Sequence, residues 1–535
     1  MKKISSRFLA AGLVLAFAFD YLFYKKPFGI SYTFWISLSV LLLVTLSQIE
    51  KVKPRWASII LGLTAIGLSS GTFLRLEPFT RFISAASAML VLMILAASYR
   101  YGYWIWYRLL DYLIQLIHLL GGAFSRAWIL VFPQRNQDAE DIESGQNQEK
   151  SKKSRPIWPV LRGIGLAFPI LLILAALLAS ADPIFNRGLK SFIEFFHIEN
   201  LPEYAFRLIY ILILAYFFSG VFIHAIYPKQ NIEKPDPLKP RMQPFLGNVE
   251  TTVVLSSINI LFALFLIIQF RYFFGGQSNI ADTGFTFSEY ARKGFNELVA
   301  VAVISLLIYL AFSSITRQKK RSQFRILTIL NVLLFGQVLV ILVSGFQRLA
   351  LYESAYGFSR LRTYSTLFIP WLAALIITVV VLEIIRRQGH FALALFITGI
   401  GFVATFIIFN VDGFIARQNI SRASISSQEG YALDYEYLDT LSNDAIPIML
   451  QTYQTTGGME KDAITASLVC RWYKMAAQEK KPWQGFNLSE NNAMRQLSVY
   501  QSTWEQYSLS ERPDYPYSLV TIDGQEYDCL YSSFD

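Results

Sequence analysis

Long apolar runs recur along most of this sequence, and eleven of them approach the length of a membrane span. A hydrocarbon core about 30 Å thick is crossed by a helix of about 20 residues. Lipid offers the backbone no hydrogen-bond partners, so a crossing chain must be helical or form a closed barrel. A barrel would show alternating segments of about ten residues, whereas these runs are continuous. The sequence therefore predicts an all-α polytopic membrane protein embedded in a lipid bilayer.

Composition supports this class, because only 16% of the residues are charged and 54% are hydrophobic, whereas soluble domains carry about 25% charged residues. The N-terminal segment "MKKISSRFLAAGLVLAFAFDYLFYKK" is predicted to be an uncleaved first span, since no A-x-A-like cleavage site follows its apolar run. The eleven predicted spans are 8–24, 30–49, 57–74, 82–99, 158–180, 204–227, 249–270, 297–316, 326–346, 364–385 and 391–410.

A long stretch without a span separates the fourth and fifth predicted helices. In "YWIWYRLLDYLIQLIHLL" the polar residues Arg108, Asp111, Gln115 and His118 form one stripe on an apolar helix. We interpret it as an in-plane interfacial helix; the alternative is a bundle helix with a polar seam. Residues 132–157 are charged and poor in apolar residues, which indicates a disordered cytoplasmic linker. The predicted regions are 1–131, 132–157, 158–410 and a C-terminal domain, 411–535.

Lysine and arginine are unevenly distributed between alternate connections. If the N-terminus is cytoplasmic, the inner connections hold 25 Lys and Arg and the outer ones 12. This bias follows the positive-inside rule and favours an N-inside orientation. An odd number of spans then places the 411–535 tail outside. The tail carries nine basic and seventeen acidic residues within a chain of net charge +10, a distribution that does not suggest a nucleic-acid binder.

The tail is too polar to be membrane-embedded and is predicted to be a small, mostly helical extracytoplasmic domain. "YSLVTIDGQEYDCLYSSF" alternates apolar and polar residues around Asp-Gly, which predicts a hairpin. The two cysteines of the chain, Cys470 and Cys529, both lie here. Outside the cytoplasm a disulfide between them is permitted, and two unpaired thiols are the alternative.

Two predicted outer loops oppose the charge rule by carrying basic residues. "YESAYGFSRLRTYS" holds Arg360 and Arg362, with Tyr352 and Tyr356 spaced i, i+4 ahead of a predicted helix break at Gly357. The loop before 297–316 carries a similar set, with one acidic residue just inside the span: Glu289, Tyr290, Arg292, Lys293 and Glu297.

Arginine binds carboxylate or phosphate in a bidentate fork. We therefore expect a basic, tyrosine-lined outer pocket for an anionic head group, a lipid-linked sugar or the acidic tail itself. Two alternatives remain open. The arginines and tyrosines can be an ordinary interfacial belt, or Glu289, Glu297 and Glu353 can pair with the basic residues and hold the loops together.

Other sequence features restrict the chemistry. Asp20 and Glu383 are ionisable residues near span ends and are expected to be interfacial or paired. Asn259, Asn331 and Gln337 are expected to form hydrogen bonds between helices. The sequence has no Walker A loop, no H-E-x-x-H, no G-x-S-x-G and no cysteine pair at metal spacing. No metal and no cofactor are therefore predicted.

Five motifs occur in order between about Asn248 and Leu450: "YFFGG", "FSEYARKGFNEL", "YGFSRLRTYS" with "WLAALI", "NVDGFIARQNI" and "LDYEYLDTLSNDAIPIML". This set resembles the bacterial multi-pass membrane proteins of the domain of unknown function 4173 family, which is closely similar to family 4153. The resemblance implies a bacterial plasma-membrane protein. It implies no established activity and no catalytic residues.

Three functions are compatible with these features. The first is a non-enzymatic transporter or envelope component that handles an anionic or lipid-linked ligand at the outer pocket. The second is a membrane-embedded transferase with an outer active site, in which Glu289 or Glu297 acts as a base. The third is a sensor or scaffold whose tail binds a partner. We rank the third last, because eleven spans exceed what an anchor needs.

Overall fold

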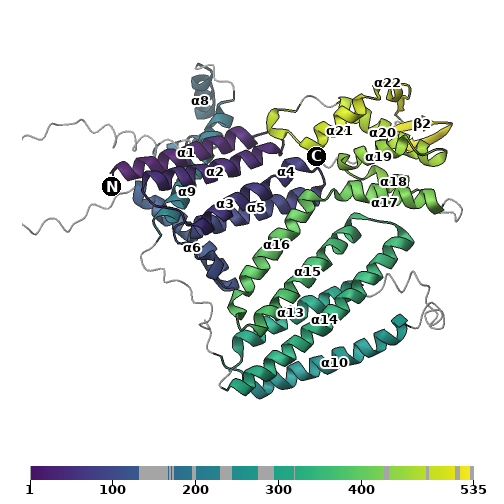
Figure 1. The fold of residues 1–535 in the computed structure, drawn as a ribbon. Helices are drawn as coiled ribbons and strands as arrows, with labels where there is room; N and C mark the ends of the chain where they lie inside the picture. Colours follow the sequence, from purple (N-terminus) through teal and green to yellow (C-terminus); the bar gives the residue numbers. More distant parts are fainter. Residues whose placement is uncertain are drawn as a thin grey trace, which may run out of the picture. The chain divides into compact units, whose positions relative to one another are not determined.

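The computed structural model describes residues 2–131, 167, 170–171, 174–195, 200–228, 244–274, 295–317, 320–426, 433–477, 481–511 and 518–529. The chain forms two compact units. Unit 1 comprises Met1–Tyr24, Leu41–Lys53 and Ile117–Lys229, and unit 2 comprises Lys25–Val40, Pro54–Leu116 and Gln230–Asp535. Figure 1 traces the helices of both units along the sequence.

Unit 1 is built around α1 (Lys2–Phe23) and α9 (Leu201–Ile226), which pack along each other. Small residues make this approach possible: a Cβ atom on Gly12 would lie 2.5 Å from the Ala215 carbonyl oxygen. Close backbone contact through small residues is a common way for membrane helices to associate. Unit 1 also contains α8 (Pro183–Phe195) and the ends of α2 (Ile30–Ile49) and α6 (Leu109–Val131), both of which begin in unit 2.

Unit 2 is a series of helices in which sequence neighbours mostly pack together. α3 packs against α5, both α10 and α13 against α14, α14 against α15, α15 against α16, and α16 against α5. The bounds are α3 (Trp56–Ser69), α4 (Gly71–Leu74), α5 (Pro78–Ser98), α10 (Asn248–Phe274), α13 (Phe295–Ile315), α14 (Arg321–Tyr356), α15 (Arg360–Ile384) and α16 (Phe391–Ile408), with short 3₁₀ turns at Tyr103–Trp106 and Gln388–His390.

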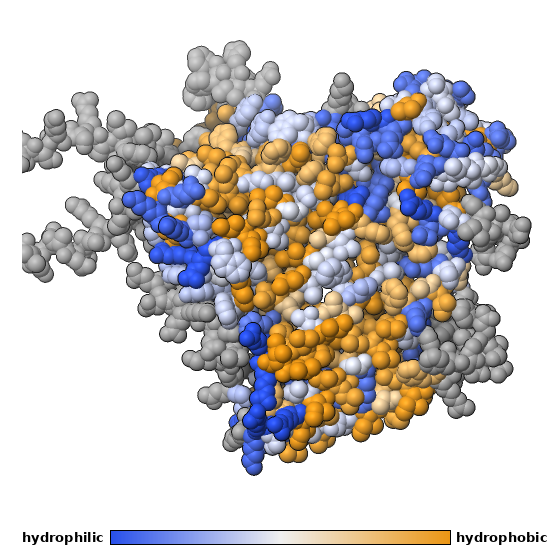
Figure 2. Space-filling model, in the orientation of Figure 1, coloured by the Kyte–Doolittle hydropathy of each residue, from blue (hydrophilic) through white to orange (hydrophobic). Residues whose placement is uncertain are grey.

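Ten helices in the described residues are long and apolar enough to cross a membrane. They correspond to ten of the eleven predicted spans; most of the predicted span 158–180, and the whole of the predicted linker 132–157, lie outside the described residues. The helix α6, predicted as interfacial, is not among the ten. Figure 2 shows hydrophobic residues covering the visible helices of unit 2 and hydrophilic residues gathered over the tail.

The predicted span 326–346 is shorter than the helix that contains it. α14 has 36 residues, which corresponds to about 54 Å at 1.5 Å per residue and exceeds a 30 Å core. The helix continues past the apolar run because Leu349 and Glu353 in its last turns are buried. It ends at Gly357, the predicted break, whose φ is 78°.

The two ends of the unit 2 helices carry different contacts. At one end, the Phe358 amide beside α15 donates to Asn419 of the tail, and the Glu77 amide before α5 donates to Asp444 of the tail. At the other end, the ring of Trp106 after α5 meets the ring of His390 before α16. The tail therefore shares one side with the connections that precede α5 and α15, as the predicted alternation of spans requires.

The tail begins with α17 (Val411–Ser426) and belongs to the same compact unit as the helices that precede it. One apolar core runs from Phe406 of α16 to Tyr527 near the end of the chain, with Phe79 of α5 packed against it. The remaining elements are α18 (Tyr435–Asp439), η3 (Asn443–Ala445), α19 (Ile446–Tyr453), α20 (Met459–Ala477), η4 (Trp483–Gly485), α21 (Leu488–Ser498), α22 (Gln501–Trp504), β1 (Leu509–Ser510), β2 (Leu519–Ile522) and β3 (Gln525–Asp528).

The strands form one antiparallel sheet in the order β1-β2-β3. Ile522 pairs with Gln525 across the Asp523-Gly524 turn, so the predicted hairpin is present. Both turn residues have positive φ, 46° and 84°, as the two-residue turns that fit the strand twist require.

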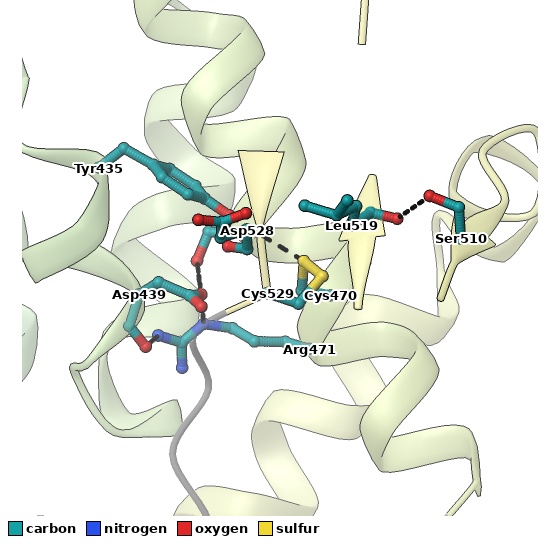
Figure 3. The surroundings of a disulfide bond; sticks show 9 residues. Tyr435, Asp439, Cys470, Arg471, Ser510, Leu519, Asp528 and Cys529 are labelled. Atoms are coloured by element: carbon teal, nitrogen blue, oxygen red, sulfur yellow. Dashed lines mark hydrogen bonds and ion pairs between the residues drawn. A yellow bond between two sulfur atoms is a disulfide. The ribbon is translucent and has the colours of Figure 1, made fainter. Parts of the chain in front are cut away.

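A disulfide joins α20 to the end of the hairpin. Cys470 and Cys529 are bonded, with their Cα atoms 5.5 Å apart (Figure 3). Beside this bond the guanidinium of Arg471 is fully buried and donates to the carbonyl oxygens of Leu438, Asp439 and Leu441. A buried charge is tolerated when hydrogen bonds replace its hydration, so Arg471 fixes the turn after α18 against α20.

Candidate functional site

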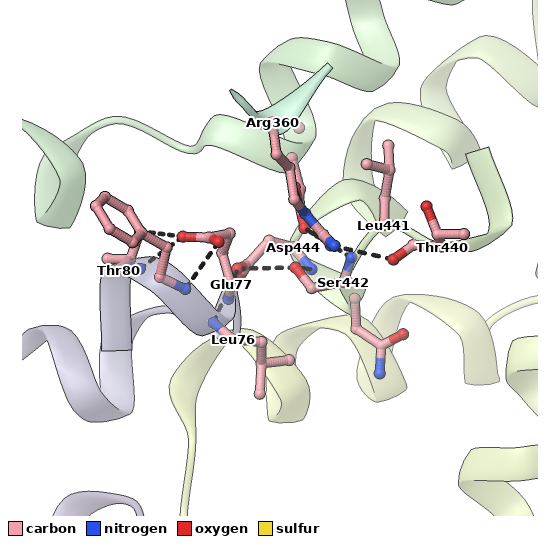
Figure 4. A network of polar contacts seen from close by, with 12 residues as sticks. Leu76, Glu77, Thr80, Arg360, Thr440, Leu441, Ser442 and Asp444 are labelled. Carbon is pink, nitrogen blue, oxygen red and sulfur yellow. Dashed lines mark hydrogen bonds and ion pairs between the residues drawn. The ribbon is translucent and has the colours of Figure 1, made fainter. Parts of the chain in front are cut away.

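A network of buried polar residues joins the start of α5 to the tail (Figure 4). The Glu77 carboxylate caps α5 by accepting from the amides of Phe79 and Thr80, at 2.9 and 2.6 Å. Asp444 of η3 accepts from the amides of Leu76 and Glu77, at 2.8 and 2.9 Å. These bonds satisfy amides that a helix start leaves without intrahelical partners. Burial raises the pKa of Asp444.

Arg360, at the start of α15, lies in the same network. Its Nε and Nη2 atoms donate to the two carboxylate oxygens of Asp412, at 2.9 and 2.7 Å. Its Nη2 atom also donates to the Thr440 carbonyl oxygen at 3.1 Å. Asp412 is fully buried. Arg360 was predicted as a ligand-binding residue. In this structure its guanidinium instead binds the carboxylate of Asp412, an acidic residue of the tail.

A pocket of about 360 Å³ opens beside this network, where α14 ends and α15 begins. Two arginines line it, Arg362 from α15 and Arg422 from α17. Tyr356, half exposed, and Tyr437 form part of the wall. The remaining lining residues are Ala355, Gly357, Phe358, Ser359, Asn419, Ala423, Leu433 and Asp434.

Backbone contacts hold the arginines of the pocket. The Nη1 atom of Arg362 donates to the Gly357 carbonyl oxygen, and the Nη2 atom of Arg422 donates to the Ala355 carbonyl oxygen, both at 2.5 Å. The guanidinium of Arg362 also lies 4.1 Å from the ring centre of Tyr352. Cations near the last carbonyls of a helix are favoured by the helix dipole. The C-terminus of α14 therefore keeps both guanidinium groups at the pocket wall.

Gly357 and Asn419 shape the pocket floor. Asn419 accepts from the Phe358 amide at 2.7 Å and donates to the Phe358 carbonyl oxygen at 2.9 Å. A Cβ atom on Gly357 would lie 2.8 Å from Arg422 and 2.9 Å from Asn419. Together with its positive φ, this crowding explains why glycine is required here.

The predicted site residues are only partly brought together. Arg362 and Tyr356 line the pocket, Tyr352 lies behind Arg362, and Arg360 is paired with Asp412. Glu353 is buried and accepts from Thr366 at 2.9 Å, and Glu297 is exposed in the first turn of α13. The other predicted residues, Glu289, Tyr290, Arg292 and Lys293, lie outside the described residues.

Sequence reasoning missed Arg422, Asn419 and Tyr437. Asn419 and Arg422 are three residues apart on α17, a spacing that places two side chains on one helical face. One of these residues could have been found from the sequence, since the motif "NVDGFIARQNI" includes Asn419. Only the fold shows that this face is turned to the connection between α14 and α15.

The carboxylates near span ends are held by hydrogen bonds. Asp20 pairs with Arg207 and accepts from Tyr210 in unit 1. In unit 2, Glu383 accepts from neutral groups on three elements: Tyr309 at 2.9 Å, Thr328 at 3.2 Å, Asn331 at 3.3 Å and Gln388 at 2.7 Å. Asn331 thus links α14 to α15, and Gln337 donates to the Asn259 carbonyl oxygen of α10. In the described part of the chain, no group of three or more His, Cys, Asp or Glu residues could hold a metal.

Comparison with known proteins identifies a family without identifying an activity. No curated protein and no solved structure matches the chain. The family model described as "Domain of unknown function (DUF4153)" matches residues 62–452. This range extends well before Asn248, where the sequence resemblance was expected to begin, and the finer assignment to family 4173 stays a prediction. It covers α5, α15 and α17, and with them both arginines of the pocket. The chain is therefore a multi-helix member of the DUF4153 family.

Proposed function

We propose that this protein binds an anionic group, a phosphate or carboxylate, in the pocket between Arg362 and Arg422. The observation that carries the proposal is the placement of two guanidinium groups on one pocket wall. A guanidinium has five N–H donors, and the hydrogen bonds of Arg362 to the carbonyl oxygens of Tyr356 and Gly357 are made by its Nη1 atom. Arginine suits bidentate recognition of carboxylate and phosphate.

The other wall residues support a ligand that carries hydroxyl groups near its charge. The Tyr437 hydroxyl accepts from the Arg360 amide at 2.8 Å, and burial raises its pKa. It therefore keeps its own proton and can donate. Asn419 and Asp434 add amide and carboxylate groups that pair with hydroxyls. An anionic lipid head group and a soluble sugar phosphate share this chemistry.

The pocket's position favours a role in handling envelope components. It lies at the ends of two candidate spans, Arg321–Tyr356 and Arg360–Ile384, so a lipid-linked ligand can reach it from the bilayer surface. We assign the protein to a bacterial plasma membrane, with the N-terminus cytoplasmic and the tail outside. The charge bias supports this orientation, as does the Cys470–Cys529 bond, since disulfides persist in oxidising compartments. A transporter or envelope component fits this arrangement best.

The proposal is tested by binding to protein reconstituted in nanodiscs of zwitterionic lipid. Arg362→Gln and Arg422→Gln are compared with Arg417→Gln, an exposed arginine on the same helix α17. Charged hydrogen bonds contribute about 1.5–3 kcal/mol, so either pocket substitution should weaken binding roughly 10- to 100-fold. The Arg417 variant should bind as the wild type does.

Two probes distinguish the sources of the anion. Inorganic phosphate represents a soluble ligand, and dihexanoyl phosphatidic acid represents a lipid head group. Tighter binding of the lipid would identify a membrane-derived ligand. Equal binding of both probes by wild type and pocket variants would contradict the proposal, provided that each variant melts at the wild-type temperature.

A further inference from the structure

The tail exposes large apolar side chains in the segment that includes η4. Trp483, Phe486 and Leu488 retain 48%, 38% and 45% of their surface. Most large apolar groups of the tail are instead buried in the core that contains Trp504. A cluster of exposed apolar residues on a polar segment commonly marks an interaction site.

This segment is held against the ends of two candidate spans. The amide of Ile30, the first residue of α2, donates to the Phe486 carbonyl oxygen at 3.1 Å. Asn487 donates to the carbonyl oxygen of Arg75, directly after α4, at 2.9 Å. A Cβ atom on Gly29 would lie 2.8 Å from the backbone carbonyl carbon of Gly485, so the two backbones are in close contact. The segment is therefore fixed at the level where these helices enter the membrane.

The ring of Trp483 extends along α2. Its centre lies 5.6 Å from that of Phe34, with the planes at 82°. Phe34 is one turn inside the candidate span Ile30–Ile49 and is 52% exposed. Trp483 therefore packs against an apolar residue of α2 that lies within a candidate membrane span.

We propose that Trp483, with Phe486 and Leu488, inserts into the head-group region of the bilayer and anchors the tail to the membrane. Tryptophan concentrates at this depth because its ring is apolar and its N–H is polar. The bilayer is the occupant that the geometry favours, because Trp483 packs against a residue of a candidate membrane span. A second copy of the chain is the competing occupant and is an outcome of the test.

The depth of residue 483 is measured in reconstituted full-length protein. A fluorescent NBD label is attached to Trp483→Cys, and a control label to Glu505→Cys, an exposed position in the same tail. The native cysteines are bonded to each other, so the introduced thiol is labelled. Interfacial groups lie within about 5–10 Å of the head-group boundary. Nitroxide lipids with shallow labels should therefore quench position 483 more than deep ones, and aqueous iodide should quench position 505.

Three results would overturn the proposal. Iodide quenching of position 483 equal to that of position 505 would place the segment in water. Protection from both quenchers would point to a second copy of the chain. The third result comes from Trp483→Phe, a variant that keeps an apolar ring. Brominated lipids quench the fluorescence of tryptophans that contact them. If the quenched fraction is the same in wild type and variant, the native ring of Trp483 does not contact lipid.

Discussion

Arg360 and Arg362 are two residues apart and have different partners, which follows from helical geometry. Positions i and i+2 of a helix do not face each other. Arg360 is directed to Asp412 and Arg362 to the ring of Tyr352. The first arginine therefore holds the tail on the helices, and the second is left at the pocket wall. A sequence motif that contains both residues can serve structure and binding together.

The ion pair between Arg360 and Asp412 predicts a stability effect at the residue scale. Removing one partner of a buried pair costs about 3–5 kcal/mol. The Arg360 side chain is 25% exposed, so we expect Asp412→Asn to cost about 2 kcal/mol, near the value of a charged hydrogen bond. Thermal unfolding in detergent should show a lower Tm for this variant.

A double-mutant cycle checks that the effect belongs to the pair. Arg360→Gln combined with Asp412→Asn should destabilise by less than the sum of the two single changes. Arg417→Gln, which changes an exposed arginine of α17, is the control and should leave Tm nearly unchanged. Strict additivity of the two single changes would refute a coupled pair.

At the scale of elements, Asp444 joins η3 to the start of α5 and should make that junction sensitive to pH. Burial raises its pKa in the folded protein above the ordinary value of about 3.9. Between these two pKa values the folded state binds more protons than the unfolded state, so this group's contribution to stability is lost as pH rises.

Asp444→Asn removes this titration and still offers an oxygen to the amides of Leu76 and Glu77. Relative to wild type, the variant should therefore gain stability as pH increases from about 4 through the folded pKa. Melting curves of both proteins between acidic and neutral pH measure the difference. Glu505→Gln, at an exposed position of the tail, serves as the control. Parallel curves for wild type and Asp444→Asn would show that Asp444 does not titrate in this range.

The elements also show what could be predicted from sequence. Apolar runs are local, so ten spans, the break at Gly357 and the Asp523-Gly524 hairpin were predictable. The contacts that build the site are not local. Asp412 is 52 residues from Arg360, and Asp444 is 367 residues from Glu77. No periodicity within one segment indicates which distant carboxylate reaches a given arginine or amide.

At the scale of the whole molecule, both proposals depend on which side of the membrane carries the tail. The connection between α14 and α15 shares that side through Asn419, whereas Arg387, two residues after the C-cap of α15, is at the other end of the helix. Arg386 and Arg387 are the basic residues expected inside, and Arg360 and Arg362 oppose that rule. One pair of accessibility measurements therefore decides the orientation.

We expect a cysteine at Ser359 to react with a membrane-impermeant maleimide in intact cells, and a cysteine at Arg387 to react only after lysis. The native cysteines are bonded to each other, so they add little background. This result would place two arginines of the pocket wall outside the cytoplasm. Positive charge is unusual on that side, and ligand binding would explain it. The opposite labelling pattern would make Arg362 an ordinary cytoplasmic charge. It would also place the Cys470–Cys529 bond in a reducing compartment, where such bonds are rare, so one measurement tests the orientation and both arguments built on it.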